Sequence, residues 1–182
     1  MRIPLLILLA AGPVGALDVL YFHIWKFSLY SRPQSSGEQL VHLIRAVVAP
    51  LLFAILLAGR PEGAWYWLVA VLFAMDTINS AVDVVLEPAS RAPIGVPRAE
   101  LALHFIGTMA MGAAWGTFMV AGWDTRNGAA ALRAHTDLPP AIALLAWSSL
   151  AIAAAVFLFE TLLVFRARAG GQAPSPVPAG AD

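Results

Sequence analysis

Histidine and acidic residues recur inside long apolar stretches of this chain, where ionisable groups are rare. Two stretches place a glutamate four residues before a histidine: Glu38 with His42, and Glu100 with His104. Residues four apart lie on one face of a helix, so each pair directs an acid and an imidazole toward the same neighbour. The predicted metal ligands are His23, Glu38, His42, Asp83, Glu87, Glu100 and His104. Imidazole and carboxylate in a chain without cysteine are typical ligands of iron, manganese or zinc.

A stripe of polar residues follows the third apolar stretch, with spacings of three, four and four: Asp76, Asn79, Asp83 and Glu87. This spacing places all four on one face of a helix. Pro88 disfavours a helical conformation at the residue before it, so we expect the helix to end at Glu87. The helix dipole disfavours an acid at that end, so Glu87 needs a nearby cation. Asp83 and Glu87 are the predicted catalytic residues, with Glu87 as proton acceptor.

The ligands fall at a common depth when each stretch is measured from its end at about 1.5 Å per residue. The residues about one helical turn inside are then His23, His42, Asp83 and His104. A second, deeper layer contains Asp18, Arg45, Asp76 and Asn79. Asp18 and His23 are five residues apart, about 140° around a regular α-helix, so both face one ion only where the helix is distorted. Glu160, in the fifth stretch, is expected to extend toward the membrane surface.

The elements that carry these residues are long and apolar. The chain has 182 residues, 60% hydrophobic and 12% charged, whereas soluble domains are about half apolar and a quarter charged. Five stretches approach the roughly 20 residues that span a bilayer, at 3–25, 40–57, 64–86, 101–121 and 141–165. We therefore predict an all-α integral membrane protein with about five transmembrane helices in one domain, residues 1–168. Residues 169–182 are rich in Gly, Pro and Ala and are predicted to be a disordered tail.

The first four stretches read as a tandem repeat of a helical hairpin. Each copy runs from an aspartate between apolar residues, through Ser-Arg and a proline, to Glu-x-x-x-His; the copies lie at 17–42 and 82–104. We predict that these four helices form a bundle from two hairpins, with the site where the halves meet. Its ligand types resemble those of di-iron carboxylate bundles, although those use Glu-x-x-His.

Composition and loop charges limit the possible location and the possible partners of the protein. The absence of cysteine excludes disulfides and thiolate sites, and no basic tract suggests nucleic acid. Six Lys or Arg residues near one face against four near the other favour an N-terminus outside and a C-terminus in the cytoplasm, in a multi-pass plasma-membrane protein. Residues 1–16 also resemble a signal peptide, but apolar character continues through Trp25, which favours a retained helix.

The leading functional hypothesis is a metal-dependent membrane enzyme with a lipid-soluble substrate. With two irons it would be an oxidoreductase; with zinc it would be a hydrolase, in which the metal lowers the pKa of bound water and Glu87 accepts the proton. The expected partners are the lipid bilayer, that substrate, and a second copy of the chain or a membrane complex.

Three alternatives remain open. The stripe on the third stretch also suits an ion, proton or metal transporter. A non-catalytic membrane subunit would use the polar cluster only to hold its helices together, with Lys26, Arg91 and Arg98 supplying counter-charges. A b-type haem held by His42 and His104 is the weakest alternative, because it leaves the carboxylates without a role.

Overall fold

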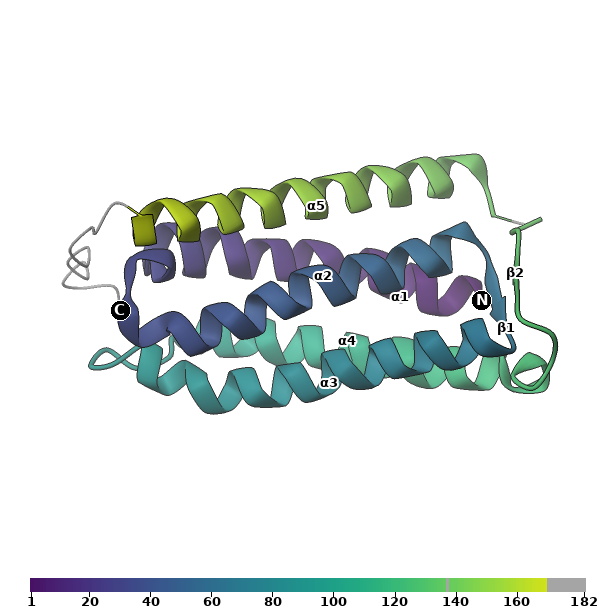
Figure 1. Ribbon diagram of the computed structural model, residues 1–182, viewed down its shortest axis with the longest axis horizontal. Coiled ribbons are helices and arrows are strands. Elements are labelled where there is room, and N and C mark those ends of the chain that lie inside the picture. The colour runs from purple at the N-terminus through teal and green to yellow at the C-terminus, as the bar shows by residue number, and fades with distance from the viewer. Residues whose placement is uncertain (137, 170–182) are drawn as a thin grey trace.

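The computed structural model describes residues 1–136 and 138–169, and within them five long helices lie side by side (Figure 1). Their bounds are α1 Arg2–Leu17, which continues as a π-helix over Asp18–Lys26, α2 Ser36–Ala58, α3 Ala64–Ser90, α4 Arg98–Ala121 and α5 Pro140–Ala169. All five are long and apolar enough to cross a membrane. The predicted all-α class and the five apolar helices are confirmed for this part of the chain.

The main helix pairs join the two halves of the predicted repeat. Helix α1 packs along α4, α2 packs along α3, and α5 lies over α2 and α1 (Figure 1). In the repeat, α1 corresponds to α3 and α2 corresponds to α4. The pair of α1 with α4 is therefore equivalent to the pair of α3 with α2. The hairpins are therefore interlocked, and residues at equivalent positions of the two copies meet across the bundle.

A two-stranded antiparallel ribbon closes one end of the bundle. Strand β1 Arg60–Glu62 pairs with β2 Ala131–Arg133, with Pro61 opposite Leu132. Three-residue strands within loops have no period-two pattern for a sequence to reveal, so the ribbon was not predicted. The N-terminus lies near this end, whereas α5 ends at the opposite end (Figure 1).

The ribbon half of the bundle contains the apolar core. Its fully buried members include Leu5, Leu52, Leu56, Tyr66, Val69, Phe73, Ala114 and Phe118. The Tyr66 and Phe118 rings stack with centroids 5.0 Å apart, and the Tyr66 hydroxyl donates to the Met119 carbonyl at 3.2 Å. The other half is filled largely by polar side chains. Apolar packing therefore holds the helices together in one half, and the buried polar residues gather in the other.

Two predicted helix ends are wrong. Helix α3 continues past Pro88 to Ser90, three residues beyond the predicted end at Glu87. The turn persists because the Arg91 amide donates to the Glu87 carbonyl at 3.1 Å and the Ser90 hydroxyl reaches the same carbonyl at 2.9 Å. Helix α5 extends to Ala169 rather than to residue 165. The predicted tail therefore loses residue 169 to this helix, and its remainder, 170–182, lies outside the described residues.

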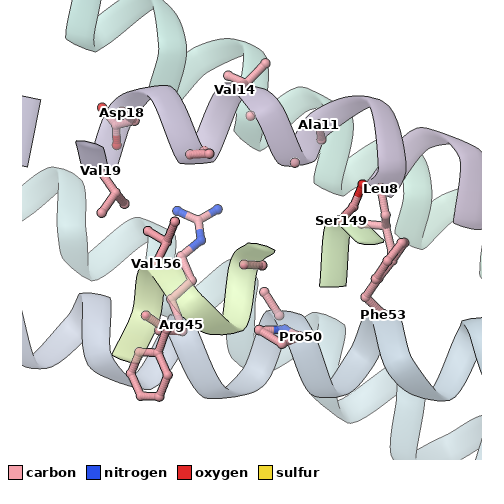
Figure 2. Close-up of a pocket in the computed structure, with 18 of the residues that line it drawn as sticks. Leu8, Ala11, Val14, Asp18, Val19, Arg45, Pro50, Phe53, Ser149 and Val156 are labelled. Atoms are coloured by element: carbon pink, nitrogen blue, oxygen red, sulfur yellow. The ribbon is translucent and has the colours of Figure 1, made fainter. Parts of the chain in front are cut away.

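A cavity of about 260 Å³ lies between α1, α2, α4 and α5 (Figure 2). All but six of its lining residues are apolar. The polar ones are Asp18, His42, Arg45, His104, Ser149 and Glu160. Five of these are ionisable and come from the polar half of the bundle, so the cavity is an apolar channel that ends at the predicted site.

Candidate metal centre

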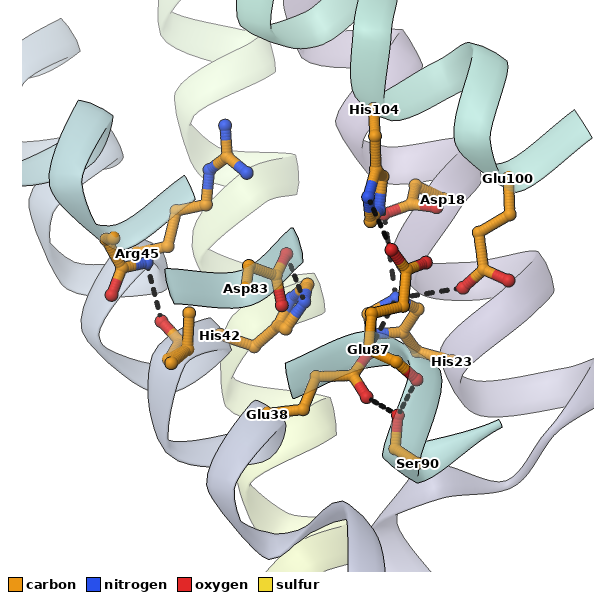
Figure 3. A network of polar contacts seen from close by, with 12 residues as sticks. Asp18, His23, Glu38, His42, Arg45, Asp83, Glu87, Ser90, Glu100 and His104 are labelled. Carbon is orange, nitrogen blue, oxygen red and sulfur yellow. Dashed lines mark hydrogen bonds and ion pairs between the residues drawn. The ribbon is translucent and has the colours of Figure 1, made fainter. Parts of the chain in front are cut away.

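The seven predicted metal ligands lie together in the polar half of the bundle (Figure 3). None of them has more than 10% of its side chain exposed. They come from the π-helix that extends α1 and from α2, α3 and α4, as the repeat predicts. Helix packing thus brings imidazoles and acids from distant parts of the sequence into one buried cluster.

One group of four residues has ligand atoms all within 4.8 Å of one another: Asp18, His23, Glu100 and His104. Nε2 of His104 is 2.9 Å from Oδ2 of Asp18. Nε2 of His23 is 3.6 Å from the same aspartate oxygen and 3.6 Å from Oε1 of Glu100. Two imidazoles and two carboxylates at these separations form a set that can hold one metal ion.

A second group shares His23 with the first. It consists of His23, Glu38 and His42, again within 4.8 Å. Nε2 of His23 lies 3.8 Å from Oε1 of Glu38, and the His23 and His42 ring centroids are 4.1 Å apart. Two potential ion positions therefore lie next to each other, with one histidine between them.

Asp83 and Glu87 lie one step outside these groups, each against a histidine. Oδ2 of Asp83 is 3.3 Å from Nε2 of His42, and Oε2 of Glu87 is 3.4 Å from Nδ1 of His104. A carboxylate beside a ligating histidine orients the ring and makes it a stronger ligand. Oε1 of Glu87 has no hydrogen-bond partner among the described residues, so it is available to accept a proton.

Equivalent residues of the repeat pair crosswise. Asp18 of the first copy contacts His104 of the second, and Asp83 of the second contacts His42 of the first. This exchange follows from the packing of α1 on α4 and of α2 on α3.

Asp18 belongs with the ligands, and its predicted place in a deeper layer is wrong. Residues Asp18–Lys26 form a π-helix, in which hydrogen bonds join residues five apart. Asp18 and His23 therefore face the same point, which a regular α-helix would prevent. The distortion that the sequence required is present, and single turns of π-helix are often found at functional sites.

Arg91 lies at the centre of the cluster, although the sequence indicated only a counter-charge for it. Its side chain is fully buried. Nη1 donates to Glu38 at 2.8 Å, Nε donates to Glu100 at 3.1 Å, and Nη2 also bonds Glu100. Nη2 is 3.9 Å from Glu87, so Arg91 is also the cation that Glu87 was expected to need.

The surroundings of Arg91 keep it charged. Burial by itself would lower its pKa, but the hydrogen bonds that Arg91 donates to Glu100 and the charge of Glu38 raise the pKa of Arg91 above its ordinary value. The guanidinium also lies over the Phe27 ring, 5.0 Å from its centroid. The sequence feature that could have identified Arg91 is its place in the repeated Ser-Arg motif. Ser90 in the same motif also contacts the cluster, because its hydroxyl bonds Glu38.

Negative charge exceeds permanent positive charge in the cluster. Its carboxylates are Asp18, Glu38, Asp83, Glu87 and Glu100, against the single arginine that contacts them among the described residues. The difference is four negative charges when every carboxylate is ionised and no histidine is protonated. A bound divalent cation would offset part of this excess.

Several buried polar atoms in the cluster form no hydrogen bond. Among the described residues these are Asp18 Oδ1, Glu38 Oε1, His42 Nε2, Asp83 Oδ1 and Glu87 Oε1. Three of them, on Glu38, His42 and Glu87, still lie 3.3 to 3.9 Å from an ion-pair partner. A buried polar atom that is left without any partner costs about 1–3 kcal/mol, and bound metal ions would satisfy these atoms.

The predicted deeper layer separates into two contacts. Nε of Arg45 lies 3.2 Å from Oδ1 of Asp76, the expected pair. The Asn79 amide donates to the Val41 carbonyl at 2.9 Å, which ties α3 to α2. Asn79 therefore has a structural contact, whereas Arg45 lines the cavity.

Glu160 does not extend to the surface as predicted. It is only 7% exposed and lines the cavity with Asp18 and His42. The reason is the position of α5 against α2, which turns this residue toward the polar half of the bundle. A fifth helix thus contributes to the surroundings of the site.

Comparison with known proteins adds no assignment, because no family model, curated protein or solved structure matches this chain.

Proposed function

We propose that this chain is a multi-pass membrane protein with a divalent-metal centre inside its bundle, and that it acts as an enzyme on a lipid-soluble substrate. The single observation that carries the proposal is a buried set of histidines and carboxylates with unpaired donor atoms. The apolar cavity that ends at the same residues supports the substrate class.

The surface of the bundle supports membrane insertion. Large apolar side chains point outward on the helices, such as Val85 at 76% and Val120 at 81% exposure. The acidic residues of the same helices are buried, as expected where lipid offers no partner. The proposed topology has the N-terminus outside and the site near the cytoplasmic face of the plasma membrane.

The donor set supports iron, manganese or zinc, and a dinuclear centre in particular. The two overlapping groups offer two neighbouring ion positions, and bound divalent ions would offset the excess negative charge of the cluster. Asp18, His23, Glu100 and His104 would hold one ion. Glu38 and His42 would border the other, with His23 beside both positions, because one ring nitrogen binds a single ion. Asp83 and Glu87 would orient His42 and His104.

The metal decides the reaction type within this proposal. Iron would supply redox chemistry with oxygen, and zinc would supply an activated water for hydrolysis. In either case Glu87 accepts or donates the proton, since its Oε1 accepts no hydrogen bond from the described residues. The substrate reaches the centre along the apolar cavity.

A structural role is the second candidate, and Arg91 is the observation that favours it. Its bonds to Glu38 and Glu100 already join α2, α3 and α4 without any metal. No contact of the described residues specifically favours transport. Haem remains the weakest alternative, because His42 and His104 each contact a carboxylate.

Metal analysis of purified protein tests the proposal. We expect about two equivalents of one metal in the wild type and a loss of metal in His23→Ala, which removes the shared ligand. His135→Ala is the matched control, because His135 contacts the Leu56 carbonyl in the other half of the bundle. Folded His23→Ala protein with the metal content of the wild type would refute the metal centre and leave the structural role.

A further inference from the structure

The cavity is elongated along the bundle. Its lining on α1 extends from Leu8 to Val19, and on α5 from Ser149 to Glu160. Eleven helical steps on each helix cover about 16 Å. The lining is apolar over most of this length, and its polar residues lie mainly at one end. The cavity therefore suits a molecule with an extended apolar part and a polar end.

Small residues create the channel along α1. Ala11, Gly12 and Gly15 line it. A Cβ atom added at Gly12 or Gly15 would meet no neighbouring atom within 4 Å. The space beside these glycines is therefore open, and a larger side chain there would occupy it without displacing the backbone.

Arg45 provides a hydrogen-bond donor at the polar end. Its guanidinium extends from α2 into the space below α1, near Asp18 and Val19 (Figure 2). Nε faces Asp76 at 3.2 Å. Neither Nη nitrogen forms a hydrogen bond with a residue of the described ranges. The four N–H groups on these two nitrogens therefore lie at the cavity without an acceptor.

The charges at this end favour an uncharged acceptor. Asp76 already balances Arg45, and the carboxylates of Asp18 and Glu160 line the same end of the cavity. In the metal-free protein, these two acids would repel an anionic head group. A carbonyl oxygen accepts a hydrogen bond from Arg45 and adds no charge.

We propose that the cavity binds a single-chain lipid with an uncharged carbonyl head group, such as an ester or an aldehyde. The carbonyl oxygen accepts from Arg45, and the chain lies along Gly15, Gly12 and Ala11. This inference rests on the proposed function, since it names the substrate class of the same centre. It places the carbonyl group beside His104 and Asp18, where the metal would act on it.

Binding of three probes to the full chain in lipid nanodiscs tests this inference. Methyl dodecanoate carries a neutral carbonyl, dodecanoate carries a charge, and dodecane lacks a head group. We expect the ester to bind more tightly than either of the others. Arg45→Met should weaken ester binding roughly 10- to 100-fold, the value of a hydrogen bond from a charged donor, and leave dodecane binding unchanged.

Further variants distinguish a specific loss of binding from misfolding of the protein. Arg45→Met with Asp76→Leu removes both members of the buried pair, and we expect the same loss of ester binding. Gly15→Leu should abolish binding of every probe. Gly112→Leu is its matched control, because a Cβ there also meets no atom within 4 Å and Gly112 does not line the cavity.

The outcomes separate this inference from the metal centre. Binding is measured before and after chelation, and metal content is determined on the same samples. Ester binding by metal-free protein upholds the lipid site even where metal analysis refutes the centre. Equal binding of ester and dodecane, tighter binding of dodecanoate, or ester binding that survives loss of Arg45 would overturn the inference.

Discussion

Replacing Arg91 with methionine removes the positive charge at the centre of the cluster and keeps much of the length of the side chain. Arg91 donates to Glu38 at 2.8 Å and to Glu100 at 3.1 Å, and all three side chains are at most 1% exposed. The substitution leaves two buried carboxylates without their cation. We therefore expect a large loss of stability when no metal is bound.

The size of the loss follows from the burial of these contacts. Removing one partner of a buried ion pair costs about 3–5 kcal/mol. Two carboxylates share one guanidinium, so the costs do not add in full, and we expect a loss on the order of 4–8 kcal/mol. Folded domains are stable by only about 5–15 kcal/mol. Arg91→Met should therefore unfold at a much lower denaturant concentration than the wild type.

Unfolding in mixed micelles, followed by circular dichroism with a chelator present, measures this loss. Arg126→Met is the control, since Arg126 lies over the Trp123 ring in a loop, and a change within about 0.5 kcal/mol is expected there. Adding Glu38→Gln and Glu100→Gln to Arg91→Met should restore most of the stability, because the two acids that Arg91 hydrogen-bonds are then uncharged. Wild-type stability of Arg91→Met, or failure of the triple variant to recover, would refute the assigned role.

Three other predictions concern the metal centre. Inserting one alanine after Leu20 places His23 six residues after Asp18 and turns it away from that residue by about another 100°, so metal should be lost while helical content is retained; unchanged metal content would contradict this. Metal at 100 times its Kd should raise the free energy of unfolding by about 2.7 kcal/mol in the wild type, and an equal rise in His23→Ala would count against a shared ligand. Asp83→Asn removes the charged partner of His42, and calorimetric titration should show a metal Kd about 10- to 100-fold higher; an unchanged Kd would remove this orienting role.

The crosswise aspartate–histidine pairs give the repeat a structural meaning. Asp18 contacts His104 and Asp83 contacts His42, so each half supplies one acid and one imidazole to the other. The halves differ where the π-helix brings His23 next to Asp18, whereas α3 has Glu87 four residues after Asp83. The additional imidazole, His23, belongs to the first half and joins Asp18 to Glu100 and His104 of the second half in the group of four.

Sequence alone determined the helices and the faces that carry polar residues. An apolar stretch of about 20 residues has few ways to satisfy its backbone away from water, so the five predicted spans and the five observed helices coincide. Spacing of three or four residues likewise determined that Glu38 and His42 share a face, as do Glu100 and His104. These properties depend on local geometry, which a sequence specifies directly.

Tertiary structure alone decided which polar residues meet. Arg91 follows the end of α3, and only the positions of Glu38 and Glu100 on neighbouring helices turn it inward. Glu160 is buried because α5 lies over α2, and Asp18 reaches the ligands because a π-helix interrupts α1. Each outcome depends on partners far away in the sequence, whose lateral arrangement no spacing along one helix specifies.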